Sequence, residues 1–171
     1  MSDKILVTFA SAAGSTEGVA EAIGQALRDG GAAVDVRPAK DVSGVSDYCA
    51  VVVGSGIRAG NMYKPALSFL ERQQDALSKM PVAYFVVCLT MQEATEENCR
   101  QVDAYVDQMR EKAPQVQPVG VGLFAGALDY KKLPLPLRMV MKGMKAEEGD
   151  FRDWDAIREW ADGLRPALLG V

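Results

Sequence analysis

Histidine is absent from the 171 residues of this sequence, and cysteine is scarce. Without an imidazole, the chain supports neither Ser-His-Asp nor Cys-His catalysis and offers no histidine ligand to a metal. The three cysteines are Cys49, Cys88 and Cys99. Their spacing contains no Cys-x-x-Cys pair, so it predicts reduced thiols rather than a zinc site or a disulfide framework. We expect no metal site, and no side chain stands out as a catalytic acid, base or nucleophile.

An excess of positive charge and a long apolar run are also missing. Lys and Arg number 19 against 23 Asp and Glu, for a net charge of −4. A nucleic-acid partner is therefore not expected, because binding phosphates requires a basic surface. No apolar run approaches the roughly 20 residues that span a bilayer, and the N-terminal residues lack the layout of a signal peptide. These features predict a cytoplasmic protein.

What the sequence does contain is a regular alternation of short apolar runs with amphipathic stretches. The apolar runs predict strands at 5–9, 34–36, 50–53, 82–89 and 119–125. Helical spacing predicts helices at 19–27, 64–77, 95–112, 134–145 and 154–169. The alternation predicts one α/β domain over residues 1–171, with a five-stranded parallel sheet between two layers of helices. Placing the strand at 34–36 on the edge gives the spatial order 2-1-3-4-5.

The loop after the first strand is the most informative segment. Ligands of open α/β sheets bind beyond the carboxyl ends of the strands at the switch point, where the loops 10–16 and 54–62 meet. The first loop is built from small and hydroxyl residues and contains no Lys or Arg. Its amides and the N-terminus of the following helix suit a phosphate group. The motifs GxxxxGK[ST] and GxGxxG are absent from it, so a phosphomonoester site and a plain capping turn remain as alternatives.

Ser11-Ala12-Ala13-Gly14-Ser15-Thr16 resembles the phosphate loop of the flavodoxin-like family, whose pattern is [ST]-x-[TY]-G-x-[ST]. Ala13 departs from this pattern and removes one hydroxyl. The resemblance implies a flavodoxin-like fold and one non-covalently bound FMN. It implies that the phosphate is held by Ser11, Ala12, Ala13, Gly14, Ser15 and Thr16. It also implies that the flavin ring is lined by Ser55, Gly56, Ile57, Arg58, Leu89, Thr90, Ala125, Gly126 and Ala127.

The segments 54–60, 125–130 and 149–154 resemble a branch of this family, the menaquinone-dependent protoporphyrinogen IX dehydrogenases. The resemblance spans essentially the whole chain and implies an FMN-dependent oxidoreductase with a porphyrinogen substrate and a quinone acceptor. A flavodoxin-type soluble electron carrier that serves a redox partner protein stays open as an alternative. A binding module that has lost its flavin is a third hypothesis, for which Ala13 is the reason.

Three side chains near the expected ring each have two interpretations. Arg58 would stabilise the negative charge of a reduced flavin and raise its potential, or it points into solvent. Tyr63 stacks on the ring, or it caps the helix that starts beside it. Thr90 bonds to the polar edge of the ring, or it is an ordinary turn residue.

The segment from Lys131 to Lys145 contains five basic residues and no acidic one. As a helix it presents an apolar face that includes Val140 and Met144, beside a basic face that includes Arg138. Such helices lie on anionic membranes, and methionines suit a flat hydrophobic ligand. This pattern predicts peripheral contact with the inner face of a membrane, or binding of a porphyrinogen or quinone. The alternative is a core helix that covers the sheet.

Overall fold

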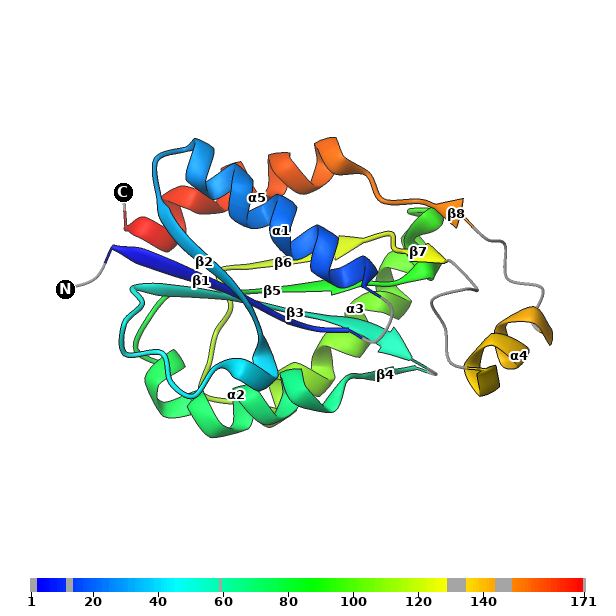
Figure 1. The fold of residues 1–171 in the computed structure, drawn as a ribbon. Coiled ribbons are helices and arrows are strands. Elements are labelled where there is room, and N and C mark those ends of the chain that lie inside the picture. Colours follow the sequence, from blue (N-terminus) through cyan, green and yellow to red (C-terminus); the bar gives the residue numbers. More distant parts are fainter. Residues whose placement is uncertain (1–2, 12–13, 59, 129–134, 144–148, 171) are drawn as a thin grey trace.

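The computed structural model of the chain describes residues 3–11, 14–58, 60–128, 135–143 and 149–170. Its centre is a sheet of five parallel strands in the order β2-β1-β3-β5-β6 (Figure 1). In that order the strands are Ala33–Pro38, Lys4–Ala10, Ala50–Arg58, Val82–Val87 and Gly120–Phe124. The predicted α/β fold and its strand order are confirmed.

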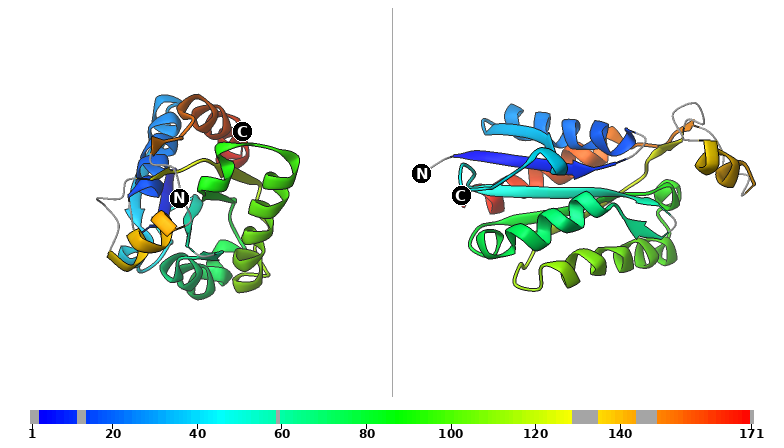
Figure 2. Two further views of the ribbon diagram at one scale, coloured as in Figure 1. Left: turned by 90° about the vertical axis from the view of Figure 1, so that its right-hand side faces the viewer. Right: turned by 60° about the horizontal axis from the view of Figure 1, so that its bottom comes forward.

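Helices cover both faces of this sheet (Figures 1 and 2). On one face lie α1 (Ser15–Asp29) and α5 (Trp154–Leu169), and on the other lie α2 (Lys64–Leu77) and α3 (Glu96–Lys112). The interior strand β5 is buried along its whole length. A strand packed from both sides reads as a continuous apolar run, which is why the sequence pattern located it. The result is a three-layer sandwich with one apolar core on each side of the sheet.

Side-chain caps define the starts of two helices. Thr95 Oγ1 accepts a hydrogen bond from the Asn98 amide at 3.1 Å, and Asp153 Oδ1 accepts one from the Ala156 amide at 3.0 Å. Each bond satisfies an amide that the helix itself leaves unpaired. Threonine and aspartate are residue types that favour this position, so the sequence itself indicates where both helices begin.

The predicted loop at 54–62 is wrong, because most of it is strand. β3 continues to Arg58 and then pairs with the short antiparallel strand β4 (Asn61–Met62). The residues Gly54-Ser55-Gly56 read as a turn in isolation, but their backbone is held by β1 on one side and β5 on the other. The predicted strand at 82–89 is also too long, since β5 ends at Val87 and a 3₁₀ turn, η2, spans Leu89–Gln92.

One excursion leaves the three layers after β6. It begins and ends with a two-stranded antiparallel ribbon, β7 (Ala127–Leu128) and β8 (Gly149–Asp150). Between them, α4 (Leu135–Gly143) stands apart from the sandwich, beyond the carboxyl ends of the strands (Figures 1 and 2). The prediction that this helix covers the sheet is wrong for its described residues, because α5 and α1 already cover that face.

Gly54 shows why the centre of β3 needs a residue without a side chain. It faces the ring of Phe85 on the neighbouring strand, and a methyl group at Gly54 would overlap that ring. Both residues are buried in the core between the sheet and α1. The glycine therefore lets an aromatic ring fill the space above two adjacent strands.

We expect Gly54→Ala to lower the free energy of unfolding by about 1–3 kcal/mol, the usual cost of overpacking a core. Gly163→Ala is the matched control, because Gly163 lies in α5 with no atom within 4 Å of the added methyl. The control should raise the stability by about 0.5–1 kcal/mol, the helix-propensity difference. Urea unfolding of both variants measures this. A Gly54→Ala midpoint equal to that of the unmodified protein would contradict the packing argument.

Candidate functional site

The carboxyl ends of four parallel strands bring the candidate residues to one edge of the sheet. Ser11 follows β1, Arg58 ends β3, Leu89 follows β5 and Ala125 follows β6. In an open α/β sheet this edge, at the point where the strand order reverses, is where ligands bind. The structure therefore gathers the described residues of both predicted groups, whereas Ala12 and Ala13 lie outside the described residues.

The phosphate loop leads into α1 through Gly14. Gly14 is the N-cap residue, with a left-handed φ of 84°, and its amide donates to Ser11 Oγ at 3.2 Å. No side chain of a described residue caps this helix. The first-turn amides of α1 are thus left for another acceptor, and the positive end of the helix dipole favours an anion.

Thr16 is the strongest sign of a ligand. Its side chain is 1% exposed, and its Oγ1 has no hydrogen-bond partner among the described residues. A methyl group at Gly56 would lie 2.9 Å from Thr16 Oγ1, so the glycine brings the end of β3 close to the hydroxyl. A buried hydroxyl without a partner costs free energy. An anion bound at the loop would supply the acceptor that this hydroxyl lacks.

The Ser55 side chain makes two hydrogen bonds within the protein, and its contact with a flavin stays a prediction. It is fully buried, and its Oγ donates to the Gly56 carbonyl at 2.7 Å and accepts from the Tyr63 amide at 3.1 Å. The hydroxyl therefore joins the end of β3 to the start of α2. Tyr63 is the N-cap residue of α2, as one interpretation predicted, although its side chain makes no capping bond.

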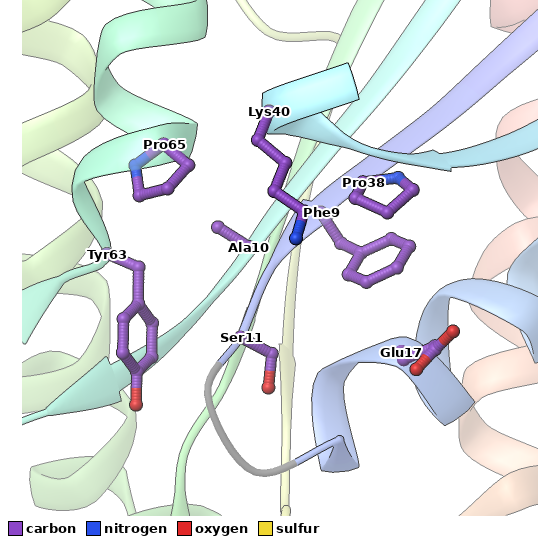
Figure 3. Close-up of a pocket in the computed structure, with 8 residues that line it drawn as sticks. All are labelled: Phe9, Ala10, Ser11, Glu17, Pro38, Lys40, Tyr63 and Pro65. Atoms are coloured by element: carbon purple, nitrogen blue, oxygen red, sulfur yellow. The ribbon is translucent and has the colours of Figure 1, made fainter. Parts of the chain in front are cut away.

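A cavity of about 230 Å³ extends from the phosphate loop toward β2. In Figure 3, Tyr63 and Glu17 lie on opposite sides of Ser11, and Lys40 reaches over the cavity from the short 3₁₀ helix η1 (Ala39–Asp41). The remaining lining residues are Phe9, Ala10, Pro38 and Pro65. Sequence reasoning did not connect Lys40 with the site, because it lies on the connection after β2 rather than on a phosphate loop.

The residues expected around the flavin ring lie at the same edge. Arg58 is exposed, and because alternate residues of a strand share a face, it lies on the face of β3 that carries Gly56. Ile57 is half-buried and packs against the core on the other face. The Thr90 carbonyl accepts a bond from Asn98 Nδ2 at 3.2 Å, which ties η2 to α3. Contact of these residues with a flavin, including the effect of Arg58 on potential, stays a prediction.

Arg152 is a residue that sequence reasoning missed. Its Nη1 lies 3.4 Å from the Ser15 carbonyl oxygen, in the first turn of α1, although 137 residues separate the two. The guanidinium is paired with Asp150 and lies over the ring of Trp154 at 4.6 Å. The hydrogen bonds with Asp150 raise the pKa of Arg152 above its ordinary value, so it stays cationic. The only signal in the sequence was the charged turn at 149–154, which carries no spatial information.

A sheet of this order with a neutral anion-binding loop after its first strand defines the class of doubly wound α/β domains that bind a phosphate-bearing ligand. The signature of the flavodoxin domain matches residues 6–155, and the chain belongs to that family. The chain binds FMN, and the unpaired Thr16 hydroxyl and Gly14 fit the phosphate of this cofactor. FMN, when bound, supplies electron and hydride transfer.

The chain is also similar to individual known proteins. It is 28% identical to a protoporphyrinogen IX dehydrogenase [quinone] of Leishmania major, over 99% of this chain and 78% of the relative. It is 25% identical to the Escherichia coli K12 protein of the same name, over 92% of each chain. Among solved structures, an archaeal flavodoxin matches with a TM-score of 0.61 and 19% identity, over 96% of this chain and 98% of the other.

We expect Thr16→Val to raise the dissociation constant for FMN about tenfold. A hydrogen bond to a charged group contributes about 1.5–3 kcal/mol, and about 1.4 kcal/mol is tenfold in affinity. Thr8→Val is the matched control, because Thr8 is also fully buried with an unpaired Oγ1, but it lies within β1. Fluorescence titration with FMN should show a raised dissociation constant for Thr16→Val and an unchanged one for Thr8→Val. Equal affinities for the two variants would show that the Thr16 hydroxyl does not contact the phosphate.

Proposed function

We propose that the chain is an FMN-dependent oxidoreductase that oxidises a porphyrinogen and transfers the electrons to a quinone. The observation that carries this proposal is α4, which stands beside the cofactor edge and leaves apolar side chains in solvent. The similarity to the Leishmania major dehydrogenase covers 99% of the chain and therefore includes this excursion. A flavodoxin core needs only its three layers to bind FMN, so the excursion is the natural place for a substrate-binding function.

The chemistry of α4 suits a flat, acidic, hydrophobic molecule. Leu135 and Met139 are 64% and 67% exposed and lie one turn apart on the helix, and Val140 is 57% exposed. Lys142 is exposed in the last turn of α4. A porphyrinogen has a broad apolar body and carboxylate groups, which these residues match in kind. Arg58, on the same edge, is proposed to favour the reduced form of the bound flavin by charge attraction.

The reaction balances without a catalytic side chain. Conversion of a porphyrinogen into a porphyrin removes three electron pairs and six protons, and three quinones take these up to become three quinols; FMN, when bound, would supply the electron-transfer chemistry between them. Among the described residues the edge of the sheet holds no histidine or paired carboxylates to act as acid or base. The role of this chain is thus to bind the two substrates in turn, to orient them and to tune the cofactor.

The test is an anaerobic assay of the FMN-loaded protein with protoporphyrinogen and a soluble menaquinone analogue, followed by porphyrin fluorescence. We expect porphyrin to form only when both protein and quinone are present. Met139→Glu should raise KM for the porphyrinogen about tenfold, because a carboxylate replaces an apolar contact of about 1.4 kcal/mol. Val119→Glu is the matched control. Val119 is 45% exposed and precedes β6, so it lies at the amino ends of the strands, away from the cofactor site.

Two results would reject this assignment. Absence of porphyrin formation with fully FMN-loaded protein would exclude the porphyrinogen as substrate. If no porphyrin forms and a reductive titration also accumulates a one-electron-reduced flavin, the results would instead favour a soluble electron carrier with a protein partner.

The quinone substrate leads to a proposal about location. We propose a cytoplasmic protein that touches the inner face of an anionic membrane through α4. The segment 131–145 carries a charge of +5 in a chain whose net charge is −4, and exposed apolar side chains accompany the basic ones on α4. None of the described helices has the length and apolarity needed to cross a bilayer. The contact proposed is therefore a peripheral one.

Sedimentation with lipid vesicles tests the contact. We expect binding to vesicles that contain phosphatidylglycerol, weaker binding to pure phosphatidylcholine, and a loss on adding salt, because the attraction is partly electrostatic. Lys142→Glu should reduce vesicle binding several-fold, because each basic residue near an anionic surface contributes about 1 kcal/mol to the binding free energy. Lys79→Glu, an exposed lysine after α2, is the control. Equal binding to the two lipids would contradict the proposal.

A further inference from the structure

The phosphate site has a deficit of positive charge. A phosphate monoester carries about −1.5 to −2 charges near pH 7, yet no Lys or Arg occurs between Lys4 and Arg28 in the sequence. Neutral amides and hydroxyls therefore make up the loop itself. Any cation that faces the phosphate must come from another part of the fold.

Arg152 is a cation that the fold brings to this loop from a distant part of the chain. Its side chain is 18% exposed, and its Nη1 approaches the Ser15 carbonyl, which belongs to the first turn of α1. A methyl group at Gly18 would collide with the Arg152 guanidinium, so this glycine lets the guanidinium lie directly against α1. A charge in this place adds to the positive end of the helix dipole.

Several contacts hold the guanidinium in place. Nε and Nη2 of Arg152 donate to the two carboxylate oxygens of Asp150 at 2.8 and 2.7 Å, and the Arg152 amide donates to Asp150 Oδ1 at 3.1 Å. The ring of Trp154 supports the group from the side. Paired donors and a planar stack restrict an arginine far more than a lysine, so the charge is preorganised beside the loop.

The same residues connect the excursion to α1. Asp150 belongs to β8 and pairs with Ala127 of β7, one of the residues expected to line the flavin ring. Asp150 is 48% exposed, against 18% for Arg152, so water screens the carboxylate more than the guanidinium. The positive member of the pair is the one that lies against α1.

We propose that Arg152 is the specificity-determining residue for the cofactor phosphate, which makes the site select FMN over the uncharged riboflavin. This inference rests on FMN binding and is independent of the substrate that the protein oxidises. Arg152 acts through its charge beside the first turn of α1, in addition to joining β8 to that helix. The Asp150 pair serves to orient it.

The experiment measures dissociation constants of the apoprotein for FMN and for riboflavin by flavin fluorescence. We expect Arg152→Gln to weaken FMN binding about tenfold and riboflavin binding less than twofold, because only FMN carries the phosphate. Arg152→Lys should keep most of the FMN affinity, since it keeps the charge. The salt dependence of FMN binding should be smaller for Arg152→Gln than for the unmodified protein.

Two controls separate charge from packing. Asp150→Asn removes a negative charge but keeps the cation and one carbonyl oxygen that can still accept a hydrogen bond from it, so FMN should bind at least as tightly as to the unmodified protein. Arg165→Gln removes an arginine that packs against Gly30 at the far end of α1, and it should leave both affinities unchanged. The proposal is overturned if Arg152→Gln weakens the binding of both flavins equally, or if Asp150→Asn weakens FMN binding as much as Arg152→Gln does. Either result would mean that Arg152 acts only by joining β8 to α1.

Discussion

The close approach of α1 to the end of β3 is the constraint on which the site depends. Gly56 has no side chain, so the Thr16 hydroxyl can lie against the strand, where it is buried and without a partner among the described residues. The same approach directs the N-terminus of α1 toward the switch point of the sheet. Ser55, one residue earlier, joins β3 to the start of α2. A side chain at Gly56 would push apart the elements that hold the cofactor.

Charge at this edge is assembled from distant parts of the chain. The phosphate loop contains no Lys or Arg, and the cations at this end of the sheet come from η1, from the end of β3 and from the turn before α5, as Lys40, Arg58 and Arg152. Under the roles proposed above, oriented amides of the loop would bind the phosphate while separate side chains would adjust affinity and potential. The overall charge of −4 conceals this local pattern.

The excursion after β6 adds a surface without disturbing the sandwich. Its ends are paired as β7 and β8, and Arg152 fastens the second strand to α1. Helix α4 can therefore carry exposed Leu135 and Met139 at no cost to either core. Exposed apolar residues on a helix promote aggregation unless a ligand, a membrane or a partner covers them. The function proposed for α4 therefore includes the nearby carboxyl ends of the strands.

Features that depend on neighbouring residues can be predicted from the amino-acid sequence alone. Buried strands such as β5 appear as unbroken apolar runs, and Thr95 and Asp153 cap the helices that follow them. The tertiary structure extends β3 to Arg58, because β1 pairs with it through Ser55, β5 through Gly56 and β4 at its last two residues, and this pairing outweighs the turn preference of two glycines. It alone also placed Arg152 against α1, since a contact across 137 residues leaves no periodic trace in the chain.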